Sequence, residues 1–210
     1  MFVIFDTETT GFGEADIVEL ASIIILDNGE RNQFRQLMKP EFPIHPKASE
    51  VHGISNEEVA NLPSSKKVVT DWLTYVKSIA EKHQETEIVF GAHNLPFDVN
   101  MISRHVSLES EKKLCSLKLA KSLSLNAPNN KLGTLYEYFG FTEKYQAHSA
   151  LDDCLMTEKV MFKLFERAGR DYYEEAIHQS RWKYTYPKHI ALHLKNEGFE
   201  NKYNILILID

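Results

Sequence analysis

The sequence predicts an α/β fold: a mixed five-stranded sheet flanked by helices, followed by a C-terminal extension to which no structure is assigned. Short runs of β-branched and aromatic residues alternate with longer segments in which apolar residues recur every three or four positions. A hairpin joins two early strands and helices separate the later ones, which is typical of a mixed sheet with helices packed on it. The chain has 210 residues, 43% of them hydrophobic and 26% charged, as expected for one globular domain.

The strands follow from the apolar runs. The second and third form a hairpin whose turn is Asp27-Asn28-Gly29, because Asn-Gly tolerates positive φ. Residues 39–63 are irregular and contain prolines, with a short helix capped by Ser55 or Asn56. The five strands are expected at residues 2–5, 17–26, 32–38, 88–90 and 114–117.

The clearest helix covers residues 64–83, where the apolar residues form a single stripe suited to burial. Asn94 is a candidate N-cap for the next helix, which tolerates Pro96 in its first turn. We place one domain over residues 1–168 and expect the extension, residues 169–210, to pack on it. The other helices are expected at 94–106, up to Lys121, and at 132–140, 149–168, 170–179 and 188–197, with an edge strand at 204–210.

The charge distribution is uneven. A net charge of −6 by itself disfavours nucleic acid, whose binding is driven by basic surface. However, the excess of acids lies within residues 1–60, which contain 11 acids and 4 bases. Such a concentration of carboxylates indicates either a solvated face or a metal site whose ions offset the charge. Composition does not choose between these two interpretations.

Cysteine content and hydropathy predict a cytoplasmic protein with no membrane partner. Cys115 and Cys154 are too few for a disulfide framework or a four-thiolate zinc site, so a reducing compartment is expected. No apolar run is long enough for a membrane span, and acids directly follow the first apolar stretch, unlike a signal peptide. The sequence does not address the oligomeric state.

Four acids and one histidine stand at the ends of predicted elements. Asp6 and Glu8 follow the first strand and, being two residues apart, point the same way. Asp98 lies in the first turn of a helix, and Asp153 lies in the first turns of the helix that follows His148. Each acid alone also fits a bland interpretation, as a surface strand end or as compensation of a helix dipole.

Taken together, these residues fit hydrolysis of a phosphodiester. An all-oxygen carboxylate cluster suits hard cations such as Mg²⁺ or Mn²⁺ rather than zinc. Two divalent ions about 3.5–4 Å apart can stabilise both the attacking and the leaving oxygen of a displacement. A histidine, with an unperturbed pKa of about 6.5, is suited to take a proton from the attacking water.

The order of the motifs carries a family resemblance. They are Phe5-Asp6-Thr7-Glu8-Thr9-Thr10-Gly11, His52-Gly53-Ile54, His93-Asn94-Leu95-Pro96-Phe97-Asp98, and His148 with Asp153 five residues on. In this order they resemble the motifs of the DnaQ-like (DEDDh) 3′–5′ exonucleases. The resemblance covers residues 2–165 and implies a ribonuclease H-like fold. Residues 115–121 and 148–154 are more similar to the exonuclease X branch than to the proofreading subunits of DNA polymerases.

The resemblance also implies roles for individual residues. Asp6, Glu8 and Asp153 would hold the first metal ion, Asp6 and Asp98 the second, and His148 would be the general base. The main chain around the Thr-rich motif would hold the terminal 3′-hydroxyl, and Phe12 would stack on or wedge beside the last base, unless it is simply an exposed turn aromatic. The expected substrate contacts are Thr7, Thr9, Thr10, Gly11, Phe12, His52 and Asn94.

The function expected from sequence is therefore a 3′–5′ exonuclease that releases nucleoside 5′-monophosphates, mainly from single-stranded DNA. Its expected partners are DNA with a free 3′ end and a polymerase or repair protein. Three alternatives stay open: an exoribonuclease of the ribonuclease T or oligoribonuclease type, a non-catalytic nucleic-acid-binding or polymerase-associated module, and a haloacid-dehalogenase-type phosphatase. Glu8 and the pair of His148 and Asp153 argue against the phosphatase, and the full set of catalytic side chains argues against the non-catalytic module.

Overall fold

The computed structural model describes residues 1–11, 13–108, 112–145 and 148–176 of the chain, and it confirms the mixed five-stranded sheet. The strand order is β3-β2-β1-β4-β5. The pairs β1–β2 and β2–β3 are antiparallel, whereas β1–β4 and β4–β5 are parallel. The strands are β1 (Phe2–Thr9), β2 (Ile17–Ile25), β3 (Arg31–Leu37), β4 (Val89–Ala92) and β5 (Lys112–Cys115).

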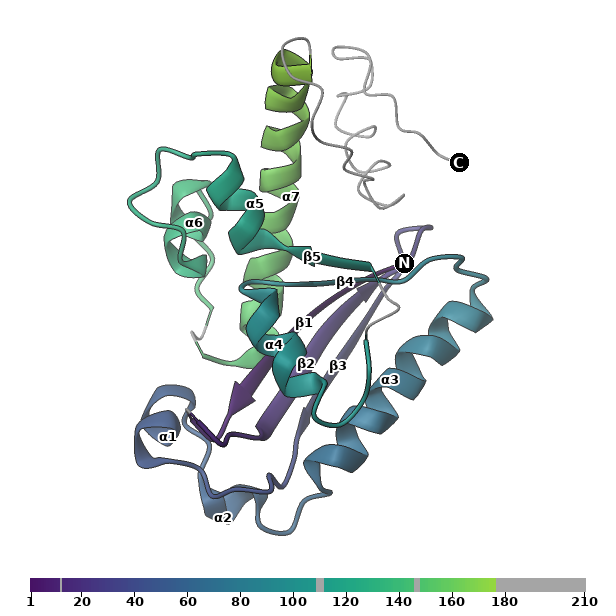
Figure 1. Cartoon of the computed structure of the whole chain (residues 1–210), viewed down its shortest axis with the longest axis vertical. Coiled ribbons are helices and arrows are strands. Elements are labelled where there is room, and N and C mark those ends of the chain that lie inside the picture. The colour runs from purple at the N-terminus through teal and green to yellow at the C-terminus, as the bar shows by residue number, and fades with distance from the viewer. Residues whose placement is uncertain (12, 109–111, 146–147, 177–210) are drawn as a thin grey trace.

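Helices cover both faces of the sheet. Figure 1 shows the long helix α3 on one side of the strands and α7, with α5 and α6 beside it, on the other. The helices of the described residues are α1 (Pro46–His52), α2 (Asn56–Val59), α3 (Ser65–Lys82), α4 (Leu95–Ile102), α5 (Ser116–Ser122), α6 (Leu132–Tyr138) and α7 (Ala150–Ala176). No helix in these parts of the chain is long and apolar enough to cross a membrane.

Alternation along β1 divides the core into two layers. Val3 and Phe5 pack with α3 and α4 in one buried cluster, whereas Phe2 and Ile4 pack with α7 in the other. Because side chains on a strand alternate between faces, Asp6 and Glu8 continue the row that faces α7. The central strand thus directs both acids toward the layer formed by the C-terminal helix.

Several element boundaries differ from the predicted ones. β1 continues through Thr9 because β2 pairs with it along its whole length, which the polar composition of residues 6–9 concealed. Helix α4 ends at Ile102 instead of residue 106, and α7 extends to Ala176 through the start of the helix expected at 170–179. The elements expected at 188–197 and 204–210 lie outside the described residues, and the domain division at residue 168 stays a prediction.

Asn94 occupies the predicted N-cap position of α4 without acting as a side-chain cap. Its backbone is left-handed, with φ of 64° and ψ of 41°, and its side chain makes no capping hydrogen bond. A capping asparagine normally has extended backbone angles, so the left-handed turn directs this side chain elsewhere. By contrast, Ser55 and Glu58 form the reciprocal capping box that was one of the two predicted starts of α2.

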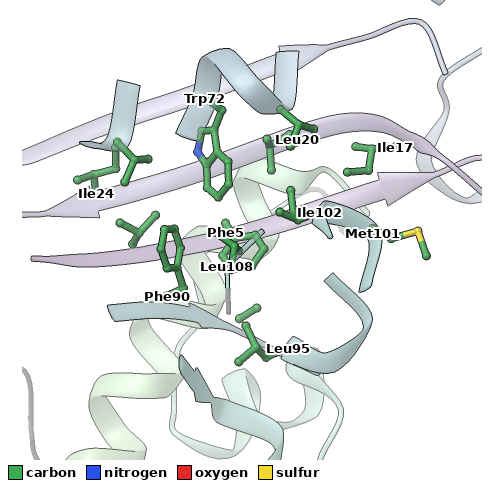
Figure 2. Packing of buried hydrophobic residues seen from close by; sticks show 14 of the residues in the cluster. Phe5, Ile17, Leu20, Ile24, Trp72, Phe90, Leu95, Met101, Ile102 and Leu108 are labelled. Atoms are coloured by element: carbon green, nitrogen blue, oxygen red, sulfur yellow. The ribbon is translucent and has the colours of Figure 1, made fainter. Parts of the chain in front are cut away.

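Trp72 anchors α3 to the sheet. It is fully buried among Phe5 and Phe90, and Figure 2 shows its ring between the helix and the strands. Its indole Nε1 donates a hydrogen bond of 2.9 Å to the hydroxyl of Ser22 on β2. The contact therefore combines the burial of a large ring with a buried hydrogen bond.

We expect Trp72→Ala to lower the free energy of unfolding by about 4 kcal/mol, because the truncation leaves a large cavity and an unpaired Ser22 hydroxyl. Trp72→Phe should have a smaller effect, since it keeps most of the buried ring. Urea denaturation followed by circular dichroism measures both. Equal losses for the two variants would show that packing contributes little at this position.

Candidate active site

The C-terminal end of β1 has a free edge, and α4 covers it. β1 pairs with β4 only through the pair of Ile4 and Gly91, because β4 ends at Ala92 and the chain then turns into α4. Asp98 on α4 uses this edge: its Oδ1 accepts from the backbone N of Thr7 at 3.1 Å and from the Thr7 hydroxyl at 2.8 Å. The short parallel strand thus places a buried carboxylate beside the two acids of β1.

The start of α7 supplies the remaining candidates from the other layer. One ligand atom of each of Glu8, His148 and Asp153 lies within 4.8 Å of the others. His148 is exposed and has a left-handed backbone with φ of 64°, which turns the chain just before the helix. Residues from β1 and from a point about 140 positions later along the chain therefore meet at one edge of the sheet.

Burial and like charge act on all four carboxylates. Burial, together with the charges of Asp98, Asp153 and Glu8, raises the pKa of Asp6 well above its ordinary value. Burial and the neighbouring acids raise the pKa of Glu8 to about 8. Burial raises the pKa of Asp98 to about 7 in spite of its hydrogen bonds from Thr7. Burial raises the pKa of Asp153 to about 6, although the charge and the backbone N–H of His148 act in the opposite direction.

The donor set fits divalent cations of the hard type. The four carboxylates share a partly buried site. The charges of Glu8, Asp98 and Asp153 raise the pKa of Asp6, and those of Asp98 and Asp153 raise the pKa of Glu8, an arrangement that is costly unless protons or cations are present. Oxygen ligands without thiolates are what Mg²⁺ and Mn²⁺ prefer. Asp6, Glu8, Asp98 and Asp153 could thus hold metal ions, with His148 at the exposed side of the cluster.

We expect a divalent cation to raise the melting temperature more at pH 8 than at pH 6. Raised pKa values mean that the folded metal-free protein binds more protons than the unfolded chain, so it loses stability as the pH rises through about 6 to 8. A bound cation removes the repulsion, and at pH 6 protons compete with it. Thermal unfolding with EDTA or with Mn²⁺ at both pH values tests this. A shift of the same size at pH 6 and pH 8 would contradict it.

A cavity of about 420 Å³ adjoins the carboxylates and shares Glu8 with them. This is large enough for a small ligand such as one nucleotide. Val51 is 53% exposed and Phe97 is 37% exposed, so both present apolar surface to solvent. The cavity is lined by Glu8, Thr9, Gly11, His45, Lys47, Ala48, Val51, His52 and Phe97.

Of the predicted substrate contacts, Thr9, Gly11 and His52 line this cavity. Gly11 has φ of +134°, a left-handed angle that side chains disfavour, and an added Cβ would come within 3.2 Å of the Cβ of His45. His52 accepts from the backbone N of Ile54 through Nδ1, so its Nε2 donates to the carbonyl of Thr9 at 3.2 Å. Its ring thus fixes the motif after β1 against α1.

The other predicted substrate contacts lie differently. The backbone N–H of Thr7 is bound to Asp98, and that of Thr10 donates to the carbonyl of Asp16 at 2.9 Å. Neither of these donors is available to a terminal hydroxyl. Neither threonine lines the described cavity, and Asn94 does not either. Phe12 lies outside the described residues.

Sequence reasoning missed Glu19, and it did not assign Phe97 or Val51 to the site. Glu19 is buried on β2, opposite Glu8, and a lone acid in an otherwise apolar strand was the signal that could have revealed it. Phe97 precedes Asp98 in the motif of residues 93–98, but the sequence does not reveal that its ring is exposed. Val51 belongs to α1, which lies within residues 39–63, a segment predicted to be largely irregular.

Comparison with known proteins decides the family. A family model described as an exonuclease, of the ribonuclease T type, matches residues 3–161, which is most of the chain. The chain belongs to the exonuclease family. Together with the carboxylates and histidine of the DEDDh pattern, this makes the protein a metal-dependent 3′–5′ exonuclease of the DEDDh type, which uses divalent metal ions.

Bacterial replication proteins are among the relatives of this exonuclease. It is 27% identical over 172 residues to the DNA polymerase III subunit epsilon of Aquifex aeolicus, covering 79% of this chain and 80% of the relative. It is 30% identical over 172 residues to the PolC-type DNA polymerase III of Thermotoga petrophila, covering 79% of this chain but 12% of the relative. The chain thus spans about an eighth of the PolC-type polymerases it matches.

Solved structures share the fold. Exonuclease X in complex with 5′ overhanging duplex DNA has a TM-score of 0.61 and 28% identity, covering 80% of this chain and 93% of the other. The nuclease domain of 3′hExo, a DEDDh family member bound to rAMP, has a TM-score of 0.66 and 16% identity, covering 79% of this chain and 91% of the other. The second likeness shows the fold alone, and with the sheet order it confirms the ribonuclease H-like prediction.

Proposed function

We propose that this exonuclease removes nucleotides from the 3′ end of DNA, mainly single-stranded, and releases nucleoside 5′-monophosphates with the help of two divalent cations, Mg²⁺ or Mn²⁺. The observation that carries the proposal is the cavity that opens beside the carboxylate cluster and shares Glu8 with it. A base held in the cavity would leave its 5′-phosphate beside the acids. The likeness to exonuclease X, whose structure contains DNA, supports DNA as the substrate.

The proposed ligands of the first cation are Asp6, Glu8 and Asp153, and those of the second are Asp6 and Asp98. Bound cations would neutralise the carboxylates and stabilise the charge that develops on the phosphate oxygens. Asp98 holds its place through Thr7, so one of its oxygens is oriented before any ligand arrives. This preorganisation favours the transition state, because little rearrangement is needed when the substrate binds.

His148 is the proposed general base. It is exposed at the edge of the cluster, where its ring can accept a proton from the water that attacks phosphorus. The bond between phosphorus and the 3′-oxygen of the preceding nucleotide then breaks. The backbone N–H of His148 donates to Asp153, which fixes the histidine relative to the carboxylates.

The proposed contacts of the terminal nucleotide are Thr9, Gly11, His52 and Phe97, all of which line the cavity. Phe97 is an exposed aromatic ring that lines the same cavity as the apolar side chain of Val51, and bases stack on such rings with little regard to sequence. Lys47 adds a positive charge at the cavity, suited to a phosphate of the strand. Contacts of Thr7, Thr10, Phe12 and Asn94 with substrate stay predictions.

We expect Phe97→Ala to raise the KM for a single-stranded oligonucleotide about tenfold and to leave kcat nearly unchanged, because stacking on one base is lost. Tyr75→Ala is the matched control: its ring is also 37% exposed, but it lies on α3 and lines no part of the cavity. Steady-state kinetics on a fluorescently labelled strand measures both. A fall in kcat with constant KM would contradict a stacking role.

The substrate is tested by digestion of four matched oligonucleotides with added Mg²⁺ or Mn²⁺. The strands are single-stranded DNA, blunt duplex DNA, single-stranded RNA, and single-stranded DNA blocked by a 3′-phosphate. We expect the unblocked single-stranded DNA to be shortened fastest from its 3′ end, with mononucleotides as products. Faster digestion of RNA would establish the exoribonuclease alternative, and binding without cleavage would establish the non-catalytic one.

A DNA polymerase is the proposed protein partner. The support is that the relatives include an epsilon subunit of DNA polymerase III and PolC-type polymerases, each matched over a segment of similar length. A repair protein is the alternative partner, and the cytoplasmic location stays a prediction. Co-purification of the tagged chain with the polymerase of the same cell tests the first of these.

A further inference from the structure

Glu19 lies at the active-site edge of the sheet but does not belong to the predicted catalytic set. It stands on β2 directly opposite Glu8 on β1, so the two side chains share the face that is covered by α7. Only 1% of its surface is exposed. Its charge is among those that raise the pKa of Asp6 and of Glu8. The charge of Glu19 thus disfavours ionisation of the two neighbouring acids. An interaction elsewhere must therefore account for a buried carboxylate at this position.

Both carboxylate oxygens of Glu19 have partners. Oε1 accepts from Nε of Arg35 on β3 at 2.6 Å, and Oε2 accepts from the backbone N of Ala150 at 3.1 Å. Each oxygen is thus already held by a donor of the protein, which favours a structural role for Glu19 over that of a further metal ligand. Its two bonds instead link the antiparallel edge of the sheet to the first residue of α7.

Ala150 is the position at which this link matters for the site. The first hydrogen bond of α7 runs from the backbone N of Asp153 to the carbonyl of Ser149, and the helix starts at Ala150. Because Ala150 is the first residue of the helix, its N–H has no partner within the helix. Ala150 is fully buried, and water cannot satisfy this group. Glu19 does so from the sheet, and its negative charge also complements the positive end of the helix.

We propose that Glu19 is a positioning residue that caps α7 from the sheet and thereby sets His148 and Asp153 in register with Glu8. A cap from within the helix would stabilise its first turn but would not fix the turn relative to β1. The cap from β2 does both, because β2 is paired with β1 throughout this region. This inference rests on the proposed function, in which His148 and Asp153 act together with the acids of β1.

A second ion pair provides a matched control. Glu158, two turns along α7, is 6% exposed and pairs with Arg31 on β3. This pair therefore joins α7 to β3, and like the pair of Glu19 and Arg35 it consists of a buried glutamate and a half-exposed arginine on β3. Among the described residues the hydrogen bond and ion pair of Glu158 go to Arg31, which is not one of the catalytic residues. Loss of either pair should destabilise the fold, but only one of them should misplace the site.

The test compares Glu19→Leu, Glu19→Gln and Glu158→Leu in the full chain. We expect Glu19→Leu to lower kcat about 100-fold with KM changed less than about threefold, because a shift of about 1 Å at the reacting groups is sufficient for such a loss. Glu19→Gln keeps an oxygen for Ala150, while Arg35 can turn to solvent, so its kcat should stay within about fivefold of wild type. Glu158→Leu should keep kcat within about threefold of wild type, even if its melting temperature falls as far as that of Glu19→Leu.

A second readout does not depend on turnover. Calorimetric titration with Mn²⁺ alone should show about tenfold weaker binding in Glu19→Leu and unchanged binding in Glu158→Leu. The proposal is overturned if Glu19→Leu keeps wild-type kcat and Mn²⁺ affinity. It is also overturned if Glu158→Leu loses as much kcat and Mn²⁺ affinity as Glu19→Leu does, or if Glu19→Gln retains neither property. A wild-type protein that binds Mn²⁺ but cuts no oligonucleotide would refute the proposed function, and the Mn²⁺ titrations would still decide the role of Glu19.

Discussion

Asp6→Asn should abolish exonuclease activity while it raises the melting temperature of the metal-free protein. Asp6 is the most crowded carboxylate of the cluster, since Asp98, Asp153, Glu8 and Glu19 all act on its pKa. A neutral amide of the same size removes this repulsion and therefore stabilises the fold in EDTA. The same change removes the proposed shared ligand of both cations, and activity should fall on the order of 10³-fold or more.

The opposite signs of the two effects make this prediction specific. A variant that is inactive because it is misfolded would melt lower, not higher. Asp71→Asn is the control: it makes the same chemical change on α3, where the side chain is exposed and paired with Lys67. Degradation of a labelled oligonucleotide and thermal unfolding in EDTA measure the two effects. An Asp6→Asn protein with full activity would remove the basis for the metal site.

His148→Asn should reduce kcat on the order of 10³-fold and leave Mn²⁺ affinity within about threefold of wild type. Positioned general bases contribute factors of about 10² to 10⁴ to rates. Asparagine is the suitable replacement because it tolerates the left-handed backbone at this position better than alanine does. Since His148 is exposed, its replacement should not disturb the core.

The Mn²⁺ measurement separates two roles for His148. One of its ring nitrogens lies within 4.8 Å of carboxylate oxygens of Glu8 and Asp153, so the geometry also admits a histidine ligand. A ligand role predicts a large loss of Mn²⁺ affinity in His148→Asn, whereas a general base predicts loss of kcat alone. Calorimetry with Mn²⁺ in the absence of DNA decides between them.

Local patterns were sufficient to predict the sheet and the meeting of the acids. Alternation along β1 placed Asp6 and Glu8 on one face, and the motif order brought Asp98 and Asp153 to the same edge. Less predictable were features that depend on contacts between distant segments. No local pattern indicated the pairing of β2 with the polar end of β1, the left-handed backbone of Asn94 or the exposure of Phe97.

Glu19 illustrates why part of the site could not be predicted. Its importance depends on Ala150, which lies 131 residues away along the chain, and no local pattern connects the two. A lone acid in an apolar strand indicates that some partner exists, since buried carboxylates need one. It does not indicate whether that partner is a cation, an arginine or the end of a helix.

The alternation along β1 places the acids of the site in contact with both layers of the core. Asp98 comes from the layer that contains α4 and Trp72, whereas Asp153 comes from the layer beneath α7. In the proposed site Asp153 holds one cation and Asp98 the other, and both cations share Asp6, so together they would link the two halves of the interior across the sheet. Transient opening of either half would then release the ions, so occupancy should slow amide exchange in both halves together, far from the ions themselves.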